Sequence, residues 1–155
     1  MSTTLISMHF QSESGAVSLM EQVTEAFKVY RAHCKDASTV VYYKDGTVTL
    51  TFLKTLASRS GESSLFWHAL SNAHFPGKQV QGLPPAPSQL PILHIDTLFM
   101  QALGRELQPG TSSLMLIVRD DWSQRVMKVL GGYRGQIYYT SLSPEDTILF
   151  ADPDV

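Results

Sequence analysis

The sequence predicts an α+β fold in which helices pack on a largely antiparallel sheet. Three patterns lead to this prediction: a strand followed by a long amphipathic helix near the N-terminus, a hairpin over residues 39–54, and a strand, helix and strand over residues 114–139. The order β-α-β-β-(α-α)-β-α-β is typical of a ferredoxin-like two-layer sandwich, here with an inserted helical and Pro-rich segment. We expect one domain over residues 1–155.

The first two elements follow from hydrophobic periodicity. Residues Thr4–Phe10 alternate, with Ile6 and Met8 on one side and Ser7 and His9 on the other, which predicts a strand. Apolar residues then recur at steps of three and four, which predicts one face of a long helix. This stripe comprises Ala16, Leu19, Met20, Val23, Ala26, Phe27, Tyr30 and Cys34.

The next two strands form the clearest hairpin of the chain. Residues Thr39–Lys44 and Thr47–Lys54 flank Asp45-Gly46, and this dipeptide predicts a two-residue turn. In the second strand Val48 and Leu50 alternate with threonines, which is typical of a sheet with one dry and one wet face.

The middle of the chain predicts two helices separated by a segment without regular structure. Residues Glu62–Ala73 form the first helix, with Leu65, Phe66, Ala69, Leu70 and Ala73 facing inward. The segment 75–91 is rich in proline, which predicts an extended linker or lid. Asp96 caps the second helix, whose inward residues are Phe99, Ala102, Leu103 and Leu107.

The last part of the chain predicts a βαβ unit. Leu114–Val118 is the first strand, Asp121 caps the helix, Gly131-Gly132 ends it, and Ile137–Tyr139 is the second strand. Trp122, Val126, Val129 and Leu130 form the inward stripe of this helix, and Ser143-Pro144 begins a short final helix.

The strand Leu114–Val118 has no polar residue, so both of its faces need cover. In the predicted fold helices cover one face of the sheet only. We therefore expect the open face to pack against a second copy in a homodimer, the alternative being that the Pro-rich linker folds back over it.

Composition excludes several classes of protein. Twelve Lys and Arg against fourteen Asp and Glu give a net charge of -2, without the basic patch that nucleic acid binding requires. The apolar runs are too short to span a bilayer. A single cysteine and the lack of a secretion signal predict a cytoplasmic protein.

No catalytic or metal-binding motif is evident. The five histidines lack the spacing of metal ligands, and Gly131–Gly135 follows a helix, whereas phosphate loops precede one. Cys34 falls on the apolar helix stripe, which predicts a buried structural residue. We therefore predict no catalytic residue, metal or cofactor.

The one candidate ligand site lies on the predicted helix Glu62–Ala73. Trp67, Ser71 and His74 would form a second face of this helix, directed toward the Pro-rich segment. Either the linker simply covers Trp67, or a small apolar pocket lies there under a movable lid.

The sequence also carries a family resemblance. The segments Gly104–Leu114 and Thr140–Ser143, with the Gly-Gly turn between them, resemble the end of the bacterial family of unknown function DUF1269. The N-terminal third is similar in its order of elements, whereas the Pro-rich middle replaces a Gly/Ala-rich apolar stretch. Members of that family are usually labelled predicted membrane proteins, and the resemblance implies no activity.

Two functions are compatible with these patterns. The first is a non-catalytic, self-associating interaction or regulatory module. The second is a small-molecule-binding protein or minor enzyme that uses Trp67, His74 and the Pro-rich segment. Peripheral membrane contact through residues 83–93 is a third, weaker possibility, which comes from the family label.

Overall fold

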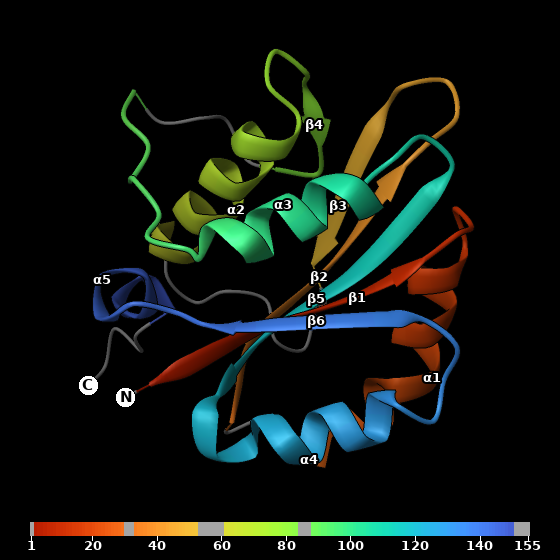
Figure 1. Cartoon of the computed structure of the whole chain (residues 1–155), viewed down its shortest axis with the longest axis vertical. Coiled ribbons are helices and arrows are strands. Elements are labelled where there is room, and N and C mark those ends of the chain that lie inside the picture. Colours follow the sequence, from red (N-terminus) through yellow and green to blue (C-terminus); the bar gives the residue numbers. More distant parts are fainter. Residues whose placement is uncertain (1, 30–32, 53–60, 84–87, 151–155) are drawn as a thin grey trace.

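The computed structural model of the chain describes residues 2–29, 33–52, 61–83 and 88–150. It is a six-stranded sheet with helices on both faces (Figure 1). In chain order the elements are β1 (Thr3–Phe10), α1 (Gly15–Val29), β2 (Cys34–Tyr42), β3 (Val48–Phe52), α2 (Gly61–His74), β4 (Val80–Gln81), α3 (Thr97–Glu106), β5 (Thr111–Arg119), α4 (Asp120–Leu130), β6 (Gln136–Ser141), α5 (Pro144–Thr147) and a 3-10 turn at Ile148–Phe150.

The strand order across the sheet is β4-β3-β2-β5-β1-β6. All neighbouring strands are antiparallel except β3 and β4, which are parallel. The predicted α+β class is confirmed. The sheet has six strands and mixed pairing, because the two-residue strand β4 within the segment 75–91 pairs with β3.

One face of the sheet, the α1/α4 face, is covered by α1 and α4. Its core is apolar and includes Ile6 and Met8 of β1 and Leu114, Leu116 and Val118 of β5. The helices contribute Ala16, Leu19, Met20, Val23, Val126 and Leu130. The stripe predicted over the first helix therefore faces the sheet, as far as its side chains are described.

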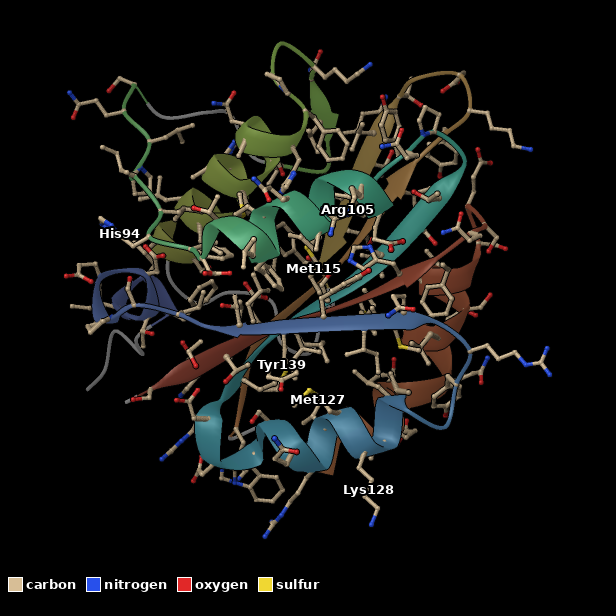
Figure 2. The ribbon with its side chains drawn as sticks, in the orientation of Figure 1. His94, Arg105, Met115, Met127, Lys128 and Tyr139 are labelled. Carbon is tan, nitrogen blue, oxygen red and sulfur yellow. The ribbon has the colours of Figure 1, made fainter. Side chains whose placement is uncertain are left out.

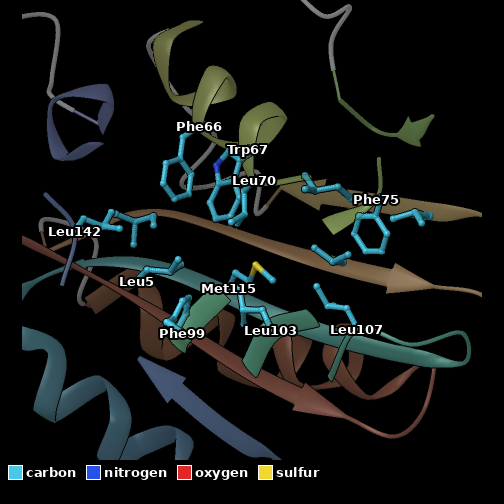
Figure 3. Close-up of a cluster of buried hydrophobic side chains, with 14 of the residues drawn as sticks. Leu5, Phe66, Trp67, Leu70, Phe75, Phe99, Leu103, Leu107, Met115 and Leu142 are labelled. Carbon is cyan, nitrogen blue, oxygen red and sulfur yellow. The ribbon is translucent and has the colours of Figure 1, made fainter. Parts of the chain in front are cut away.

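The opposite face, the α2/α3 face, is covered by α2 and α3 (Figures 1 and 3). Its apolar core combines Leu5, Met115 and Ile117 of the strands with Trp67 of α2 and Leu103 of α3. The expectation that helices cover one face only is wrong, since the segment between β3 and β5 supplies a second helical layer. Leu114–Val118 is central and buried on both sides within one chain, so it gives no reason for a dimer.

The hairpin between β2 and β3 has a longer turn than predicted. Tyr43 N donates to Thr47 O at 2.9 Å and Gly46 N donates to Tyr43 O at 2.9 Å, which leaves three residues between Tyr43 and Thr47. Gly46 alone has a positive φ, of 91°, whereas a two-residue type I′ turn needs positive φ at both central residues. Asp45 instead stabilises the turn, because its carboxylate accepts from Thr47 N at 2.9 Å and from Thr47 Oγ1 at 2.7 Å.

Cys34 is the first residue of β2 and not part of the first helix. Its predicted structural role is confirmed, since the side chain is buried in the apolar core of the α1/α4 face. Burial, assisted by the neighbouring Asp36, raises the pKa of Cys34 to about 12. The thiol is therefore a poor nucleophile at neutral pH.

The predicted starts of the late helices are largely confirmed. Asp96 caps α3 and accepts from Phe99 N at 3.0 Å, and Phe99, Ala102 and Leu103 face the core. Ser143 caps α5 and accepts from Asp146 N at 3.1 Å. The predicted start of α4 is two residues off, because Arg119 occupies the cap position and Asp120 and Asp121 both lie in the first turn.

Candidate functional site

Helix α2 is rotated relative to the prediction, with Trp67 at the centre of its buried face. The buried residues of α2 include Phe66, Trp67, Leu70 and Ser71, whereas Ala73 is exposed. Trp67 is 0% exposed and belongs to the buried face of α2, and its role in a ligand site beside the Pro-rich segment stays a prediction. Residues 84–87 of that segment lie outside the described residues.

A buried hydrogen bond explains this orientation. Trp67 Nε1 donates to Asp36 Oδ2 at 2.8 Å, and Asp36 is 0% exposed on β2. A buried carboxylate and a buried indole N–H each need a partner, and here they satisfy each other. Phe66 and Phe150 pack edge-on around the indole ring, at centroid distances of 5.2 Å and 6.3 Å.

The pKa of Asp36 is raised even though two N–H donors contact its carboxyl group. Burial raises its pKa to about 6, while the hydrogen bonds from Trp67 Nε1 and Ala37 N oppose the shift. Desolvation therefore dominates over hydrogen bonding at this carboxyl group.

Ser71 and His74 lie on the same side of α2 as Trp67, spaced four and three residues apart. Ser71 is buried, and His74, the last residue of α2, is partly buried. The Nε2 atom of His74 is buried and has no hydrogen-bond partner among the described residues. Burial lowers the pKa of His74, which favours a neutral ring.

A buried polar cluster on the α2/α3 face lies near His74. His9 of β1 contacts two hydroxyls: Ser7 Oγ is 2.8 Å from Nε2 and Ser113 Oγ is 2.5 Å from Nδ1. Burial, together with the neighbouring His74, lowers the pKa of His9 to about 4. The imidazole is therefore neutral near pH 7, with both nitrogens engaged.

Tyr138 of β6 connects this cluster to α3. Its ring packs edge-on to His9, with centroids 5.6 Å apart, and its hydroxyl donates to Glu106 Oε1 at 2.8 Å. The α2/α3 face thus joins residues of β1, β5, β6 and α3 around one neutral histidine.

Sequence reasoning assigned Ser7 and His9 to one side of the first strand but gave them no role. The available signal was their position on the same side as Leu5, in a strand that is buried on both faces. Ser113 belongs to the same cluster because the antiparallel register of β1 and β5 places it opposite His9. That register is a tertiary property, which the sequence pattern does not specify.

Strand β6 is the last strand of the sheet (Figure 1), and among the described residues it pairs with β1 alone. Leu142 N donates to Thr3 O at 2.9 Å, which fixes the direction of the alternating backbone groups along the strand. Gln136, Tyr138 and Thr140 therefore point their amides toward β1. The N–H and C=O groups of Ile137, Tyr139 and Ser141 point away from the sheet.

The side chains of β6 do not protect this edge. The strand reads Gln-Ile-Tyr-Tyr-Thr-Ser, with no charged residue and no proline, and its register against β1 is regular. Tyr139 is 59% exposed and lies on the α4 side of the strand, near the Met127 label in Figure 2. Proteins commonly protect edge strands with charges, prolines or bulges.

The described part of the chain contains no further cluster of metal-binding or acid–base side chains. No group of three His, Cys, Asp or Glu side chains there could hold a metal ion. Asp120 accepts from Thr4 Oγ1 at 2.5 Å, and Asp121 lies 3.6 Å from Arg119 Nε, so this acidic pair is engaged locally. Among the described helices, none combines the length and apolar composition that crossing a bilayer requires.

Comparison with known proteins gives one match. The family model described as Protein of unknown function (DUF1269) matches residues 86–151, which is less than half of the chain. The resemblance is thus confirmed for the segment from α3 to the final 3-10 turn. Strand β1, which lies between β5 and β6 in the sheet, is outside the matched segment.

Neither the curated proteins nor the solved structures include a match to this chain. The similarity of residues 86–151 to a family of unknown function is therefore what the comparisons establish, and it assigns no activity.

Proposed function

We propose that this protein is a non-catalytic interaction module that associates with a second copy of itself through strand β6. The observation that carries the proposal is the row of outward backbone groups at Ile137, Tyr139 and Ser141, on an edge without charge, proline or bulge. Unpaired strand edges are templates for pairing with another chain. The homodimer predicted from an open sheet face is thus replaced by one that forms at the sheet edge.

A two-fold axis through Tyr139 gives this association a defined register. Antiparallel pairing would place Tyr139 opposite Tyr139 of the second copy, and Ile137 opposite Ser141. All three residues have outward backbone groups, so each pair would exchange two hydrogen bonds. Such an isologous contact closes on itself and yields a dimer with one continuous sheet.

Size-exclusion chromatography with light scattering tests this association. We expect a mass of twice the 17.2 kDa chain at high micromolar concentration. Tyr139→Pro removes an outward N–H and should reduce the mass to that of one chain, with an unchanged circular dichroism spectrum. Tyr139→Lys should act in the same direction, because opposing lysines at the two-fold axis repel each other.

Thr140→Pro is the matched control, because the Thr140 amide points toward β1. We expect it to destabilise the folded chain itself and not selectively the association. A wild-type mass of one chain would overturn the proposal, as would a dimer that survives both Tyr139 substitutions.

The architecture that carries this edge is also a proposal. We propose that β1, α1, β2, β5, α4 and β6 form a ferredoxin-like core, with β3, α2, β4 and α3 inserted between β2 and β5. The order β6-β1-β5-β2 and the placement of α1 and α4 on one face support this view. The single domain over residues 1–155, the role of segment 75–91 as a linker or lid and a cytoplasmic location stay predictions.

Small-molecule binding beneath α2 is a second candidate function. The buried Nε2 of His74 favours it, because this atom lacks a partner among the described residues. The third possibility, membrane contact through residues 83–93, gains less support. Leu83 and Leu93 pack against the core of the α2/α3 face, although Ile92 is 83% exposed.

A further inference from the structure

Some buried polar groups beneath α2 have no hydrogen-bond partner among the described residues. A neutral imidazole has one N–H and one bare nitrogen. In the cluster around His9, one serine hydroxyl must therefore accept from the N–H, and the other donates to the bare nitrogen. The hydroxyl that accepts keeps its own hydrogen, for which the described residues offer no hydrogen-bond acceptor in the structure.

Two further buried groups on this face lack partners. Ser38 Oγ and His74 Nε2 make no hydrogen bond to a described residue, and Ser38 is 0% exposed. Ser38 pairs with Met115, and Ser113 is two residues from Met115 on the same face of β5. Such diagonal neighbours lie roughly 7–8 Å apart, so Ser38 borders the cluster that contains His9.

Unsatisfied buried groups are costly, at about 1–3 kcal/mol each. Three of them lie on this side of the sheet and indicate a molecule that the described residues do not supply, whereas His33 Nδ1, on a residue stacked on Trp122 of α4, is a single buried atom of the same kind elsewhere. His74 of α2, which acts on the pKa of His9, is one of the three residues that the sequence singled out for a ligand site.

The charges of the region restrict the chemistry of this molecule. The carboxylate of Asp36 is held by Trp67 and Ala37, and that of Glu106 by Tyr138. His9 and His74 are imidazoles in a buried environment that disfavours charge. A charged ligand would therefore enter without a free counter-ion among these groups, at high cost.

We propose that a small uncharged molecule, one that both donates and accepts hydrogen bonds, binds between α2 and the sheet and contacts His74 Nε2, Ser38 Oγ and the hydroxyl pair at His9. This inference rests on the second proposed function, small-molecule binding, and is independent of association through β6. A primary amide satisfies these requirements because its carbonyl accepts and its NH₂ group donates.

Acetamide is a direct probe for this site. We expect acetamide to raise the melting temperature of the wild-type protein with a saturable concentration dependence, since a ligand that binds only the folded state stabilises it. Ser38→Ala and His74→Phe should each weaken the apparent affinity at least tenfold. Asn72→Ala is the matched control on the exposed side of α2 and should leave the affinity unchanged.

Crystals soaked in acetamide separate a ligand site from simple hydration. Density for acetamide on Ser38 and His74 would support the proposal. Ordered water alone at these atoms would overturn it, as would equal thermal shifts in the wild-type protein and Ser38→Ala. Light scattering of the same samples reports association separately, so failure of one proposal leaves the other measurable.

Discussion

The two faces of the central sheet are built from the same strands but differ in chemistry. On the α1/α4 face, β1 and β5 contribute the apolar residues Ile6, Met8, Leu114, Leu116 and Val118. They also contribute two buried hydroxyls: Thr4 Oγ1 donates to Asp120 Oδ1, and Ser112 Oγ donates to Ser12 O and accepts from Ala16 N. On the α2/α3 face, the same two strands contribute Leu5, Met115 and Ile117 together with the polar cluster around His9. Both faces therefore combine buried apolar area with side-chain hydrogen bonds, and on the α2/α3 face these bonds centre on the imidazole of His9.

This difference bears on where function can reside. Apolar packing tolerates substitutions that conserve volume and carries little directional information. Buried polar groups fix relative positions, because each needs a partner at a defined distance. The bond between Trp67 and Asp36 sets the rotation of α2 in this way, and it thereby turns Ser71 and His74 toward the sheet.

The largest effects should come from adjacent residues that face opposite layers. Leu116→Ala removes a side chain from the α1/α4 face and Ile117→Ala removes one from the α2/α3 face, and both residues are 0% exposed. We expect each substitution to lower the free energy of unfolding by about 2–5 kcal/mol, because each leaves a cavity. Urea denaturation at two protein concentrations measures these losses.

Equal, concentration-independent losses would confirm that one chain covers both faces. A small loss for Ile117→Ala, or a loss that varies with protein concentration, would instead support the earlier expectation that this face of the sheet is open in one chain and covered by a second copy.

A second test uses the opposite titrations of His9 and Asp36. The pKa of His9 is lowered from 6.5 to about 4, so its contribution to stability is present above pH 6.5 and lost as pH falls through about 4. The pKa of Asp36 is raised from 3.8 to about 6, so its contribution is present below pH 3.8 and lost as pH rises through about 6. Each shift corresponds to roughly 3 kcal/mol.

In the wild-type protein these two contributions offset each other between about pH 4 and pH 6. We expect Asp36→Asn to be more stable at the upper end of this range than at the lower end, and His9→Gln to show the reverse. Urea denaturation across the range measures both slopes. If the free energy of unfolding changes with pH in the same direction in both variants, the assignment of these pKa shifts is contradicted.

The bond between Trp67 and Asp36 should give an intermediate effect. Trp67→Phe keeps an aromatic ring in the core but leaves Asp36 Oδ2 without its donor. We expect a loss of about 1–3 kcal/mol, since a buried acceptor is left unsatisfied. A double-mutant cycle with Asp36→Asn checks the cause, and additive losses would show that the hydrogen bond does not link the two residues.

The smallest effect should come from Ser38, in contrast with Ser113. Ser38→Ala removes a buried hydroxyl that has no described partner, so without added small molecules we expect a change within about 1 kcal/mol, neutral or stabilising. Ser113→Ala leaves His9 Nδ1 without its partner and should cost about 1–3 kcal/mol. Thermal unfolding of the two variants side by side measures the contrast, and equal losses would contradict it.

Local patterns predicted most of the elements. The cap at Asp96, the inward stripe of α3, the strand Leu114–Val118 and the start of α5 at Ser143 follow from short-range rules of capping and periodicity. The first helix was extended too far, to Cys34, because the apolar spacing continues across the change from helix to strand. The turn at Asp45-Gly46 was assigned two residues, although Asp45 keeps a negative φ and the loop closes over three.

The candidate site could be predicted only in part. Trp67, Ser71 and His74 do share one side of α2, but the sequence gave no means of telling that this side faces the sheet. Both stripes of α2 carry apolar residues, and the choice between them depends on Asp36, which is 31 positions away. His9 and Ser113 meet through strand pairing over 104 positions.

The sequence by itself determined the α+β class, the succession of helices and strands and the need to cover both faces of β5. These properties depend on periodicity and capping within a few residues. Only the tertiary structure decided that α2 and α3 provide the second layer, that β6 is an open edge and that His9, Ser113 and His74 lie together. The order of strands and the docking of α2 depend on contacts between distant segments, which local patterns leave undetermined.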